Sequence, residues 1–474
     1  MSPILFISLL VVYLYTVVSS ISVILLENRN SVRSLSWIMV LVFLPFIGVF
    51  LYLVIGQNYR KQKIISKKSV RHNTPAPATE LHPEDYSDFV THSNHLNLIR
   101  LLHKNSDAAA YAYNKIEVLS DGTNTFRAMF EAMEAAKSHI HIEFFIFEDD
   151  RISNELRKLL IRKAQSGVRV RMIYDYLGSF GLTRNYLKSL REAGVYVRPF
   201  LPLRLRLRRS KINFRNHRKI LIVDGKYGFT GGLNFADRYL FGNTLGKWRD
   251  TFIRMEGAVV HGLQSQFLTD WYFVERKLIT DPKYYPTPEK FKENVVQVVS
   301  SGPDTDWESI MQGFARAIIS ADTYVYMHTP YFVPNDVILN AVISAALSGT
   351  DVRLMIPERS DSRLSDACTF SYMGEILEAG VKVYLYTEGF LHSKAIVSDD
   401  FISIVGSANL DERSFNQNFE ANAFIYDKET AMTLKQLFID DIQNCRALSF
   451  ADWNNRKRRQ KIKESFARLF SPII

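Results

Sequence analysis

The chain has 474 residues, of which 47% are hydrophobic, and a formal net charge of +10 at pH 7. This length allows two or three domains with large apolar cores, and the positive charge favours anionic partners such as membrane lipid or nucleic acid. Only two cysteines occur, which excludes a disulfide framework and a cysteine-rich zinc site. The sequence contains no G-x4-G-K-[ST] loop, so nucleotide hydrolysis is not supported.

Two uncharged segments begin the chain, residues 1–26 and the run from Ser34 to Tyr59. Each is longer than the roughly 20 apolar residues that span a bilayer core, which predicts two transmembrane helices. A cleaved signal peptide is the alternative for the first segment, but it lacks a basic start and a second apolar segment follows at once. More basic residues follow the second segment than lie between the two, which predicts cytoplasmic catalytic domains in a multi-pass protein of the cell membrane. We expect a membrane anchor at residues 1–60 and a basic, polar linker at 61–112.

One motif, H-x-K-x4-D-x6-G-[GS]-x-N, occurs twice. Its typed positions are His217, Lys219, Asp224, Gly232 and Asn234 in the first copy and His392, Lys394, Asp399, Ser407 and Asn409 in the second. Because alternate side chains share one face of a strand, each histidine projects beside its lysine, and the returning strand brings the asparagine near them. An imidazole, an ammonium group and an amide are suited to phosphoryl chemistry. A structural histidine is the alternative for one copy, but two copies favour an active site.

A larger repeat surrounds the motif. The amphipathic segment Thr125 to Lys137 leads to an apolar strand at Ile140 to Phe147, and the segment Glu308 to Ser320 leads to another at Tyr324 to Phe332. Alternating helices and strands predict an α/β sandwich in each half of the chain. We expect a first domain at residues 113–288 and a second at 289–474, related by a pseudo-two-fold axis.

The first half contains an 11-residue insertion before its motif. Basic residues alternate there with apolar ones, at Arg204, Arg206, Arg208, Arg209, Lys211 and Arg215. We interpret this stretch as a ribbon at the mouth of the site that attracts anionic headgroups, and a solvated charged face is the alternative. The basic amphipathic tail at residues 456–470 lies on an anionic membrane surface or caps the second domain, and the sequence leaves both interpretations open.

Two carboxylates in apolar strands are candidates to orient the histidines. Asp250 and Glu420 each lie in such a strand, where a lone buried charge is costly and a histidine is a suitable partner. An ordinary surface acid is the alternative for each. His139 and His141 form an H-x-H pair, which we interpret as part of a structural strand rather than as a metal site. We therefore expect no metal and no cofactor.

The paired motifs resemble those of the phospholipase D superfamily, and the whole chain is similar to its bacterial cardiolipin synthases. The resemblance implies two phospholipase D-like domains and reversible phosphatidyl transfer between two phosphatidylglycerol molecules, which gives cardiolipin and glycerol through a phosphohistidine. It also implies an active-site set, with attack assigned to His217, formed by His217, Lys219, Asp224, His392, Lys394 and Asp399. The substrate phosphate would be bound at Asn234, Asn409, Gly232 and Ser407. Gly232 replaces the serine often found there, which puts a hydroxyl contact on that side in doubt.

The residues alone are compatible with three hypotheses about function. The partners we expect are phosphatidylglycerol and anionic membrane lipid, without nucleic acid, since two membrane segments disfavour a nuclease. A hydrolytic phospholipase D would use the same residues with water as the acceptor. A catalytically silent lipid-binding membrane protein is the non-enzyme alternative, and two intact motifs argue against it. The sequence leaves a homo-oligomer open.

Overall fold

The computed structural model describes residues 3–26, 31–44, 47–52, 80–202 and 213–471. The chain divides into two compact units. The small unit comprises Met1–Gln62 and Leu203–Phe214, and the large unit comprises Lys63–Pro202 and Arg215–Ile474.

The small unit is helical. Its described helices are α1 (Pro3–Leu26), α2 (Ser31–Phe43) and α3 (Ile47–Leu51). The Tyr13 hydroxyl on α1 donates a hydrogen bond of 2.8 Å to the Leu41 carbonyl on α2, beside a small apolar core. Among the described residues, no helix combines the length and the apolar character that crossing a membrane requires.

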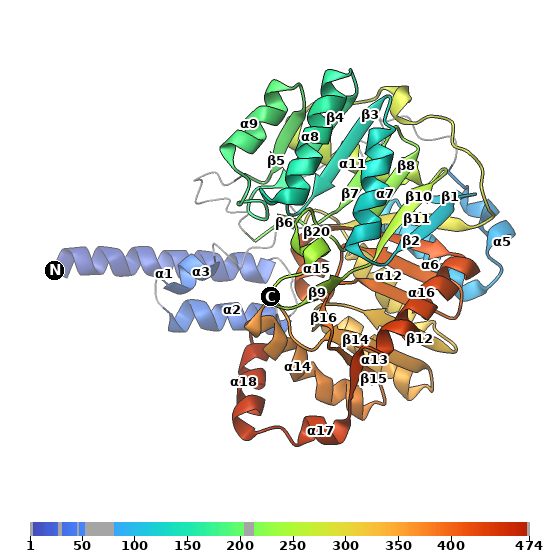
Figure 1. Ribbon diagram of the computed structural model, residues 1–474. Coiled ribbons are helices and arrows are strands. Elements are labelled where there is room, and N and C mark those ends of the chain that lie inside the picture. The colour runs from blue at the N-terminus through green and yellow to red at the C-terminus, as the bar shows by residue number, and fades with distance from the viewer. Residues whose placement is uncertain (1–2, 27–30, 45–46, 53–79, 203–212, 472–474) are drawn as a thin grey trace. The chain divides into compact units, whose positions relative to one another are not determined.

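Two mixed sheets form the centre of the large unit, and their strand orders repeat (Figure 1). The first sheet has the order β2 (Lys115–Leu119), β10 (Phe252–Glu256), β8 (Tyr227–Gly231), β7 (Ile220–Val223), β3 (His139–Phe144), β4 (Arg169–Asp175) and β5 (Tyr196–Phe200). The second sheet repeats it as β11 (Val295–Ser301), β20 (Asn418–Tyr426), β18 (Ile402–Gly406), β17 (Ala395–Ser398), β12 (Tyr324–His328), β14 (Asp351–Pro357) and β15 (Lys382–Tyr386), with β1 (Ala110–Ala112) and β21 (Cys445–Leu448) at its edges. The last three strands of each order are parallel and the others are antiparallel. The internal repeat predicted from the sequence is therefore present in the fold.

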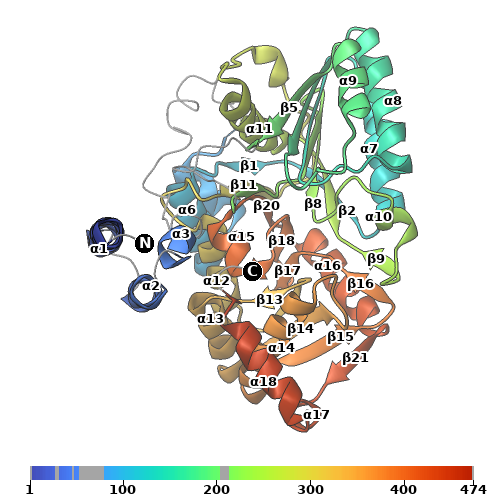
Figure 2. The same ribbon diagram turned by 90° about the vertical axis from the view of Figure 1, so that its left-hand side faces the viewer.

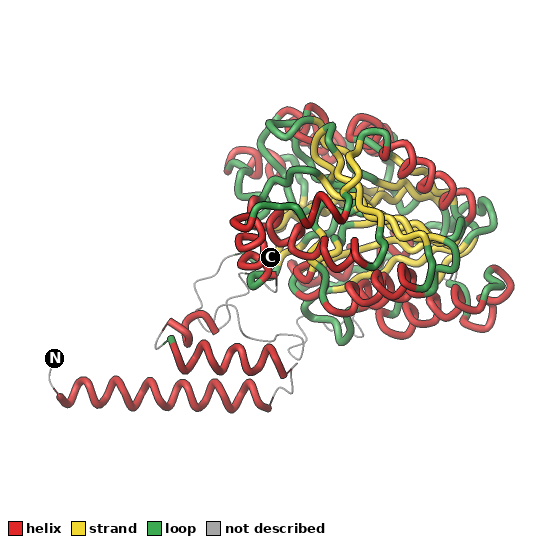
Figure 3. The backbone as a smooth tube through the Cα atoms, turned by 90° about the horizontal axis from the view of Figure 1, so that it is seen from below, coloured by secondary structure: helices red, strands yellow, loops and turns green. Residues whose placement is uncertain are grey.

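Helices cover both faces of each sheet, so that the strands lie inside the large unit and the helices outside (Figure 3). Those of the first half are α7 (Gly122–Glu134), α8 (Arg151–Gln165), α9 (Arg184–Glu192), α10 (Arg238–Phe241), α11 (Val260–Glu275) and the 3-10 turn η4 (Pro282–Tyr284). Those of the second half are α12 (Ser309–Ile319), α13 (Asp336–Leu347), α14 (Arg363–Glu378), α15 (Glu412–Asn416) and α16 (Lys428–Ile442). Three further helical elements come before the first half in the sequence: η2 (Pro83–Asp85), α5 (Tyr86–Phe89) and α6 (Ser93–Ser106). Helices α7, α8 and α9 lie on one face of the first sheet and α11 on the other (Figure 2). This two-sided cover explains why every residue of central strands such as β3 and β20 is buried.

Short strands link the two halves. Strand β6 (Arg215–Asn216) pairs in parallel with the start of β20, and β16 (Gly389–Leu391) pairs in parallel with β9 (Lys247–Arg249). Another short pair, β13 (Phe332–Val333) with β19 (Leu410–Asp411), lies within the second half. Strands β6 and β16 directly precede the two motifs, so each motif is attached to the opposite half.

The C-terminal tail packs on the second half through α17 (Phe450–Asn454) and α18 (Arg458–Arg468). Ala467 is buried in the core of that half. Ile462, Phe466 and Leu469 remain 61%, 62% and 73% exposed. The tail thus caps the domain and also presents an apolar face among basic residues.

Candidate active site

Each motif histidine is anchored to the opposite half through its backbone. The His217 N–H donates to the Phe419 carbonyl at 2.9 Å, and the His392 N–H donates to the Arg249 carbonyl at 2.7 Å. These bonds continue the short parallel pairings of β6 with β20 and of β16 with β9. The strand pairing therefore fixes the backbone of both histidines independently of the contacts that their side chains make.

The histidine side chains repeat the exchange between the halves. His217 Nδ1 lies 2.9 and 3.0 Å from the two carboxylate oxygens of Glu420, and His392 Nδ1 lies 2.7 Å from Asp250 Oδ2. Both carboxylates are buried. When Nδ1–H donates to a carboxylate, Nε2 is left to act as a nucleophile or a base. The structure thus brings together the two histidines and the two acids that the sequence singles out.

The residue between histidine and lysine supports this arrangement in each motif. Arg218 donates two hydrogen bonds of 2.8 Å to the Asp270 carboxylate and one of 3.2 Å to the Glu420 carbonyl. In the other motif, Ser393 Oγ donates to Thr251 Oγ1 at 2.7 Å. Both contacts hold the backbone beside the acid that pairs with the histidine of the same motif.

The two lysines lie beside the histidines and are almost completely buried. Lys219 Nζ donates to the carbonyl oxygen of its own histidine, His217, at 2.7 Å, and Lys394 makes the equivalent bond to His392. Burial lowers the pKa of Lys219 to about 7 and that of Lys394 to about 8. A bound phosphate would favour the charged form of both, since a nearby opposite charge raises the pKa of an amine.

Burial also controls the protonation of the histidines and their acids. It lowers the pKa of His217 to about 4 and lowers the pKa of His392 well below its ordinary value, so both imidazoles are neutral near pH 7. Burial alone would raise the pKa of Glu420, but His217 and Lys219 hold it below the ordinary value. For Asp250, burial prevails and raises the pKa to about 7. The His217 pair thus contains an ionised carboxylate, whereas the His392 pair retains a proton near neutral pH.

The two motif asparagines, Asn234 and Asn409, line the cavity that lies between the two histidines. Asn234 Nδ2 donates to the Tyr239 hydroxyl at 2.7 Å, and its Oδ1 accepts from the Ile146 N–H at 3.2 Å. Asn409 Nδ2 donates to Asp411 Oδ2 at 2.9 Å. Asn409 Oδ1 is buried and has no hydrogen-bond partner in the described part of the chain.

Gly232 and Ser407, which we expected at the substrate phosphate, are directed elsewhere. The backbone N–H of Gly232 donates to the Thr251 carbonyl at 3.1 Å, and that of Ser407 donates to the Ala421 carbonyl at 3.0 Å. The Ser407 hydroxyl donates to Glu420 and accepts from the Ala421 N–H at 3.0 Å. Because these donors are already engaged within the protein, both positions support the histidine-bound carboxylates rather than a ligand.

The motif aspartates are also separated from the histidines. Asp224 follows β7, whereas His217 precedes it, and the Asp224 carboxylate accepts three hydrogen bonds of 2.8 Å from the backbone N–H groups of residues 137–139. Asp399 accepts equivalent bonds from residues 322–324 at 2.7 to 3.0 Å. The structure therefore does not bring these aspartates into the active-site set that the resemblance implies. They hold the helix-to-strand turn at the far end of the motif strand.

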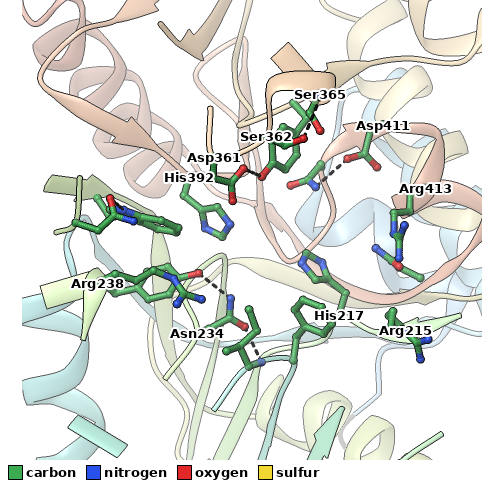
Figure 4. A pocket seen from close by; sticks show the side chains of 18 of the residues that line it. Arg215, His217, Asn234, Arg238, Asp361, Ser362, Ser365, His392, Asp411 and Arg413 are labelled. Carbon is green, nitrogen blue, oxygen red and sulfur yellow. Dashed lines mark hydrogen bonds between the residues drawn. The ribbon is translucent and has the colours of Figure 1, made fainter. Parts of the chain in front are cut away.

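A cavity of about 610 Å³ lies between the two histidines and is lined by both halves (Figure 4). Its wall near His392 is aromatic, with the Trp248 and Tyr239 rings 5.3 and 5.6 Å from the imidazole centroid. Near His217 the Phe145 ring lies 5.0 Å away. Sequence reasoning missed these aromatic residues, because nothing in the pattern of residues 239–248 distinguishes cavity-lining rings from core rings.

Other polar residues at the cavity are also additions from the structure. Tyr331 donates to Asp361 Oδ1 at 2.5 Å, and both residues line the cavity with Arg238 and Arg413. The two arginines occupy corresponding positions, each four residues after its motif asparagine. This spacing was the available signal for them.

The predicted basic ribbon is represented by one described residue. Arg204, Arg206, Arg208, Arg209 and Lys211 lie outside the described residues. Arg215 is placed on β6 and lines the cavity.

The H-x-H pair of the first sheet is engaged in the interior. His139 and His141 both contact Gln264 Oε1, at 3.1 and 3.2 Å, and Arg171 lies 3.0 Å from His141 Nε2. Within the described ranges, no group of three or more His, Cys, Asp or Glu side chains is arranged to hold a metal ion.

Comparison with solved structures places this fold in a known class. Phosphatidylserine synthase from Haemophilus influenzae matches with a TM-score of 0.59 at 15% sequence identity, over 80% of this chain and 100% of that one. At this identity the likeness concerns the fold, which is the paired α/β architecture described above.

Comparison of sequences gives the family. The family model described as "Cardiolipin synthase, PLD-like domain" matches residues 129–271 and 314–442, and the model "Phospholipase_D-nuclease N-terminal" matches residues 12–57. "Cardiolipin synthase 2" from Bacillus cereus is 40% identical over 95% of this chain and 89% of its own length. "Major cardiolipin synthase ClsA" from Bacillus subtilis is 39% identical over 98% of both chains. The chain belongs to the cardiolipin synthase family with phospholipase D-like domains.

Proposed function

We propose that the chain is a cardiolipin synthase that transfers a phosphatidyl group between two phosphatidylglycerol molecules and releases glycerol. The observation that carries the proposal is the reciprocal pairing of His217 with Glu420 and of His392 with Asp250 around one cavity. A phosphodiester between two oriented imidazoles can be attacked by one while the other protonates its leaving group. The full-length relatives named as cardiolipin synthases support the choice of lipid substrate.

The first step is attack on the donor lipid. His217 Nε2 forms a bond to phosphorus, and the bond from phosphorus to the oxygen of the headgroup glycerol breaks. His392 Nε2 gives a proton to the departing oxygen while Asp250 passes its own proton to Nδ1, so the imidazole stays neutral. We assign attack to His217 because its carboxylate partner, Glu420, is ionised, whereas the pair of His392 and Asp250 retains a proton near pH 7. An ionised partner stabilises the positive charge that develops on an attacking imidazole.

The second step reverses the roles with a new alcohol. His392 Nε2 accepts the proton of the terminal hydroxyl of a second phosphatidylglycerol and returns one from Nδ1 to Asp250, and the hydroxyl oxygen attacks the phosphoryl group on His217. The bond from phosphorus to His217 breaks, which yields cardiolipin and the starting enzyme. Because each step is the chemical reverse of the other in form, the transfer is reversible.

Lys219, Lys394, Asn234 and Asn409 hold the non-bridging oxygens of the reacting phosphate in this proposal. All four are buried, and the two asparagines line the cavity. Charge-assisted hydrogen bonds to developing negative charge are most effective in such buried surroundings. Asp250 and Glu420 act as positioning residues for the histidines. The domains at residues 113–288 and 289–474 are related by a pseudo-two-fold axis through the cavity, in keeping with the repeated strand order.

The protein acts at the cell membrane in this proposal, with residues 1–60 as an anchor of two transmembrane segments and the catalytic domains in the cytoplasm. The uncharged segments and the N-terminal family match at residues 12–57 support the anchor. A second contact is formed by α18, whose exposed apolar residues lie among basic ones, a pattern that binds anionic lipid surfaces. In a chain of residues 61–474, which lacks the anchor, substituting Phe466→Ser with Leu469→Ser should weaken binding to anionic vesicles in flotation experiments, and unaltered flotation would remove α18 from the proposal.

Product analysis tests the activity directly. Purified protein in detergent or vesicles is incubated with phosphatidylglycerol, and the lipids are separated by thin-layer chromatography. Cardiolipin with an equal amount of free glycerol supports the proposal. Phosphatidic acid as the main product would indicate a hydrolytic phospholipase D, and an unchanged lipid would indicate a binding protein.

A further inference from the structure

Arg215 carries a buried charge that no hydrogen bond from its terminal nitrogens satisfies among the described residues. Its side chain is 5% exposed, and neither terminal guanidinium nitrogen has a hydrogen-bond partner within the described part of the chain. Asp175 lies near enough to favour its charge, but that carboxylate accepts hydrogen bonds from the backbone of residues 177, 178 and 216. Because an unpaired buried charge is costly, this guanidinium requires an anion from outside the protein.

Arg413 increases this requirement. It projects from α15 into the same cavity, and Figure 4 shows both arginines on the His217 side, away from His392. Burial, assisted by the like charge of Arg413, lowers the pKa of Arg215. Two guanidinium groups that repel each other form a suitable site for a phosphate, whose oxygens can accept from both.

The opposite side of the cavity is built differently. Arg238, which corresponds to Arg413, is bound to Glu148, and its guanidinium carbon lies 5.5 and 5.3 Å from the ring centroids of Tyr239 and Trp248. Arg215 lies two residues before His217, and the corresponding residue before His392 is Phe390, which is fully buried. The cavity therefore has one side with satisfied, aromatic surroundings and one side with two available cations.

We propose that Arg215 and Arg413 bind the phosphate of the acceptor lipid while its glycerol hydroxyl reaches the phosphoryl-histidine. The inference rests on the proposed function, because cardiolipin synthesis needs two phosphodiesters in one cavity and only the donor's phosphate lies between the histidines. The two phosphates of the product are joined by one glycerol, so the second phosphate must lie close to the first. A bound acceptor phosphate selects a lipid alcohol over water.

A comparison of two reactions of the full-length enzyme isolates this site. Cardiolipin formation from phosphatidylglycerol needs the acceptor phosphate, whereas exchange of labelled free glycerol into phosphatidylglycerol proceeds through the same intermediate with a neutral acceptor. In Arg215→Gln and Arg413→Gln, the ratio of cardiolipin formation to glycerol exchange should fall about 10- to 100-fold, the effect expected for losing a charged hydrogen bond. The loss should appear as a higher KM for phosphatidylglycerol in cardiolipin formation but not in glycerol exchange, with a larger share of phosphatidic acid.

Arg127→Gln is the matched control, because it removes the same charge from an exposed position on α7, where Arg127 contacts Asn124. It should leave the ratio as in the wild type. Melting temperatures monitor folding, and Arg413, which is half-buried, tests the site if the Arg215 variant unfolds. Equal loss of both reactions would show that the arginines hold the reacting phosphate, and an unchanged ratio would show no phosphate site; either result overturns the inference. A wild type without either reaction would instead refute the proposed function.

Discussion

Asp250 fills the space beside Gly232, because a Cβ atom built on Gly232 would lie 2.2 Å from Asp250 Oδ1. The corresponding pair in the other half is Ser407 and Glu420, whose side chains are hydrogen-bonded to each other. Glutamate is one methylene longer than aspartate, so the Glu420 carboxylate lies farther from its own backbone. This leaves room beside the carboxylate for the Ser407 hydroxyl. Glycine with aspartate and serine with glutamate are thus two solutions to the same task of holding a carboxylate against a histidine.

Substitutions at these small residues should therefore have unequal effects. Gly232→Ser should displace Asp250 and reduce kcat about 100-fold or more, since a misplaced acid-base partner forfeits most of its contribution. Ser407→Ala should reduce kcat only about tenfold, because Glu420 keeps its bonds to His217 and Asn418. Steady-state kinetics of cardiolipin formation measures both, and equal effects would contradict this account.

Removing the charge of either positioning carboxylate should slow the reaction while preserving the fold. Glu420→Gln and Asp250→Asn keep the size of the side chain but remove its negative charge. The amide no longer holds the histidine in the tautomer with Nδ1 protonated and no longer stabilises a positive imidazole, so we expect kcat to fall about 10²- to 10⁴-fold. Glu420→Asp should recover part of the activity if position and charge are what matters. A variant that keeps full kcat would refute the positioning role.

The two histidines should differ with an activated substrate. His217→Ala and His392→Ala should both abolish transfer between natural lipids, because attack and proton donation are both required. With a leaving group that departs without a proton, the variant lacking only the general acid should still accumulate phosphoryl-histidine. Rapid quench and mass spectrometry locate the label: we expect it on His217 in His392→Ala. A label on His392 in His217→Ala would reverse the assignment.

The reaction should depend on pH in a bell shape. As pH rises through about 7, the Asp250 carboxyl loses the proton that its pair supplies and Lys219 becomes neutral, so activity should decrease on the alkaline side. As pH falls towards about 4, His217 becomes protonated and can no longer attack. The pH dependence of kcat/KM checks both limbs. Using a substrate with an activated leaving group should remove the part of the alkaline limb that reports proton donation, and an identical profile with both substrates would contradict this origin.

Asp224 and Asp399 should affect stability more than chemistry. Asp224→Ala removes the acceptor of three backbone hydrogen bonds, one of them from the buried residue His139, which should reduce the free energy of unfolding by about 2–4 kcal/mol. The remaining folded enzyme should keep a kcat within about threefold of the wild type, as measured after active-site titration. A large loss of kcat in a stably folded Asp399→Ala or Asp224→Ala protein would place these residues in the catalytic machinery.

Much of the fold followed from local patterns in the sequence. The repeated helix and strand signals predict two α/β halves, and the repeated strand order agrees with them. The histidines, lysines and asparagines could be found from spacing because each motif is one continuous hairpin. The position of Asp224 relative to the active site could not be predicted from spacing, since spacing along a strand does not tell which end of the strand faces the site. Arg413 and Trp248 reach the cavity through packing between distant segments, which no local pattern records.

The exchange of acids between the halves has a consequence for how this enzyme can evolve. Neither half contains a complete histidine and acid pair, so an ancestral single repeat would have needed a second copy of itself to work. In a single chain the two repeats can differ in sequence, provided that each still supplies an acid to the histidine of the other. Gly232 with Asp250, Ser407 with Glu420, and Arg215 opposite Phe390 are such divergences. Because the two halves differ at these positions, one cavity can treat two chemically identical lipids as different reactants.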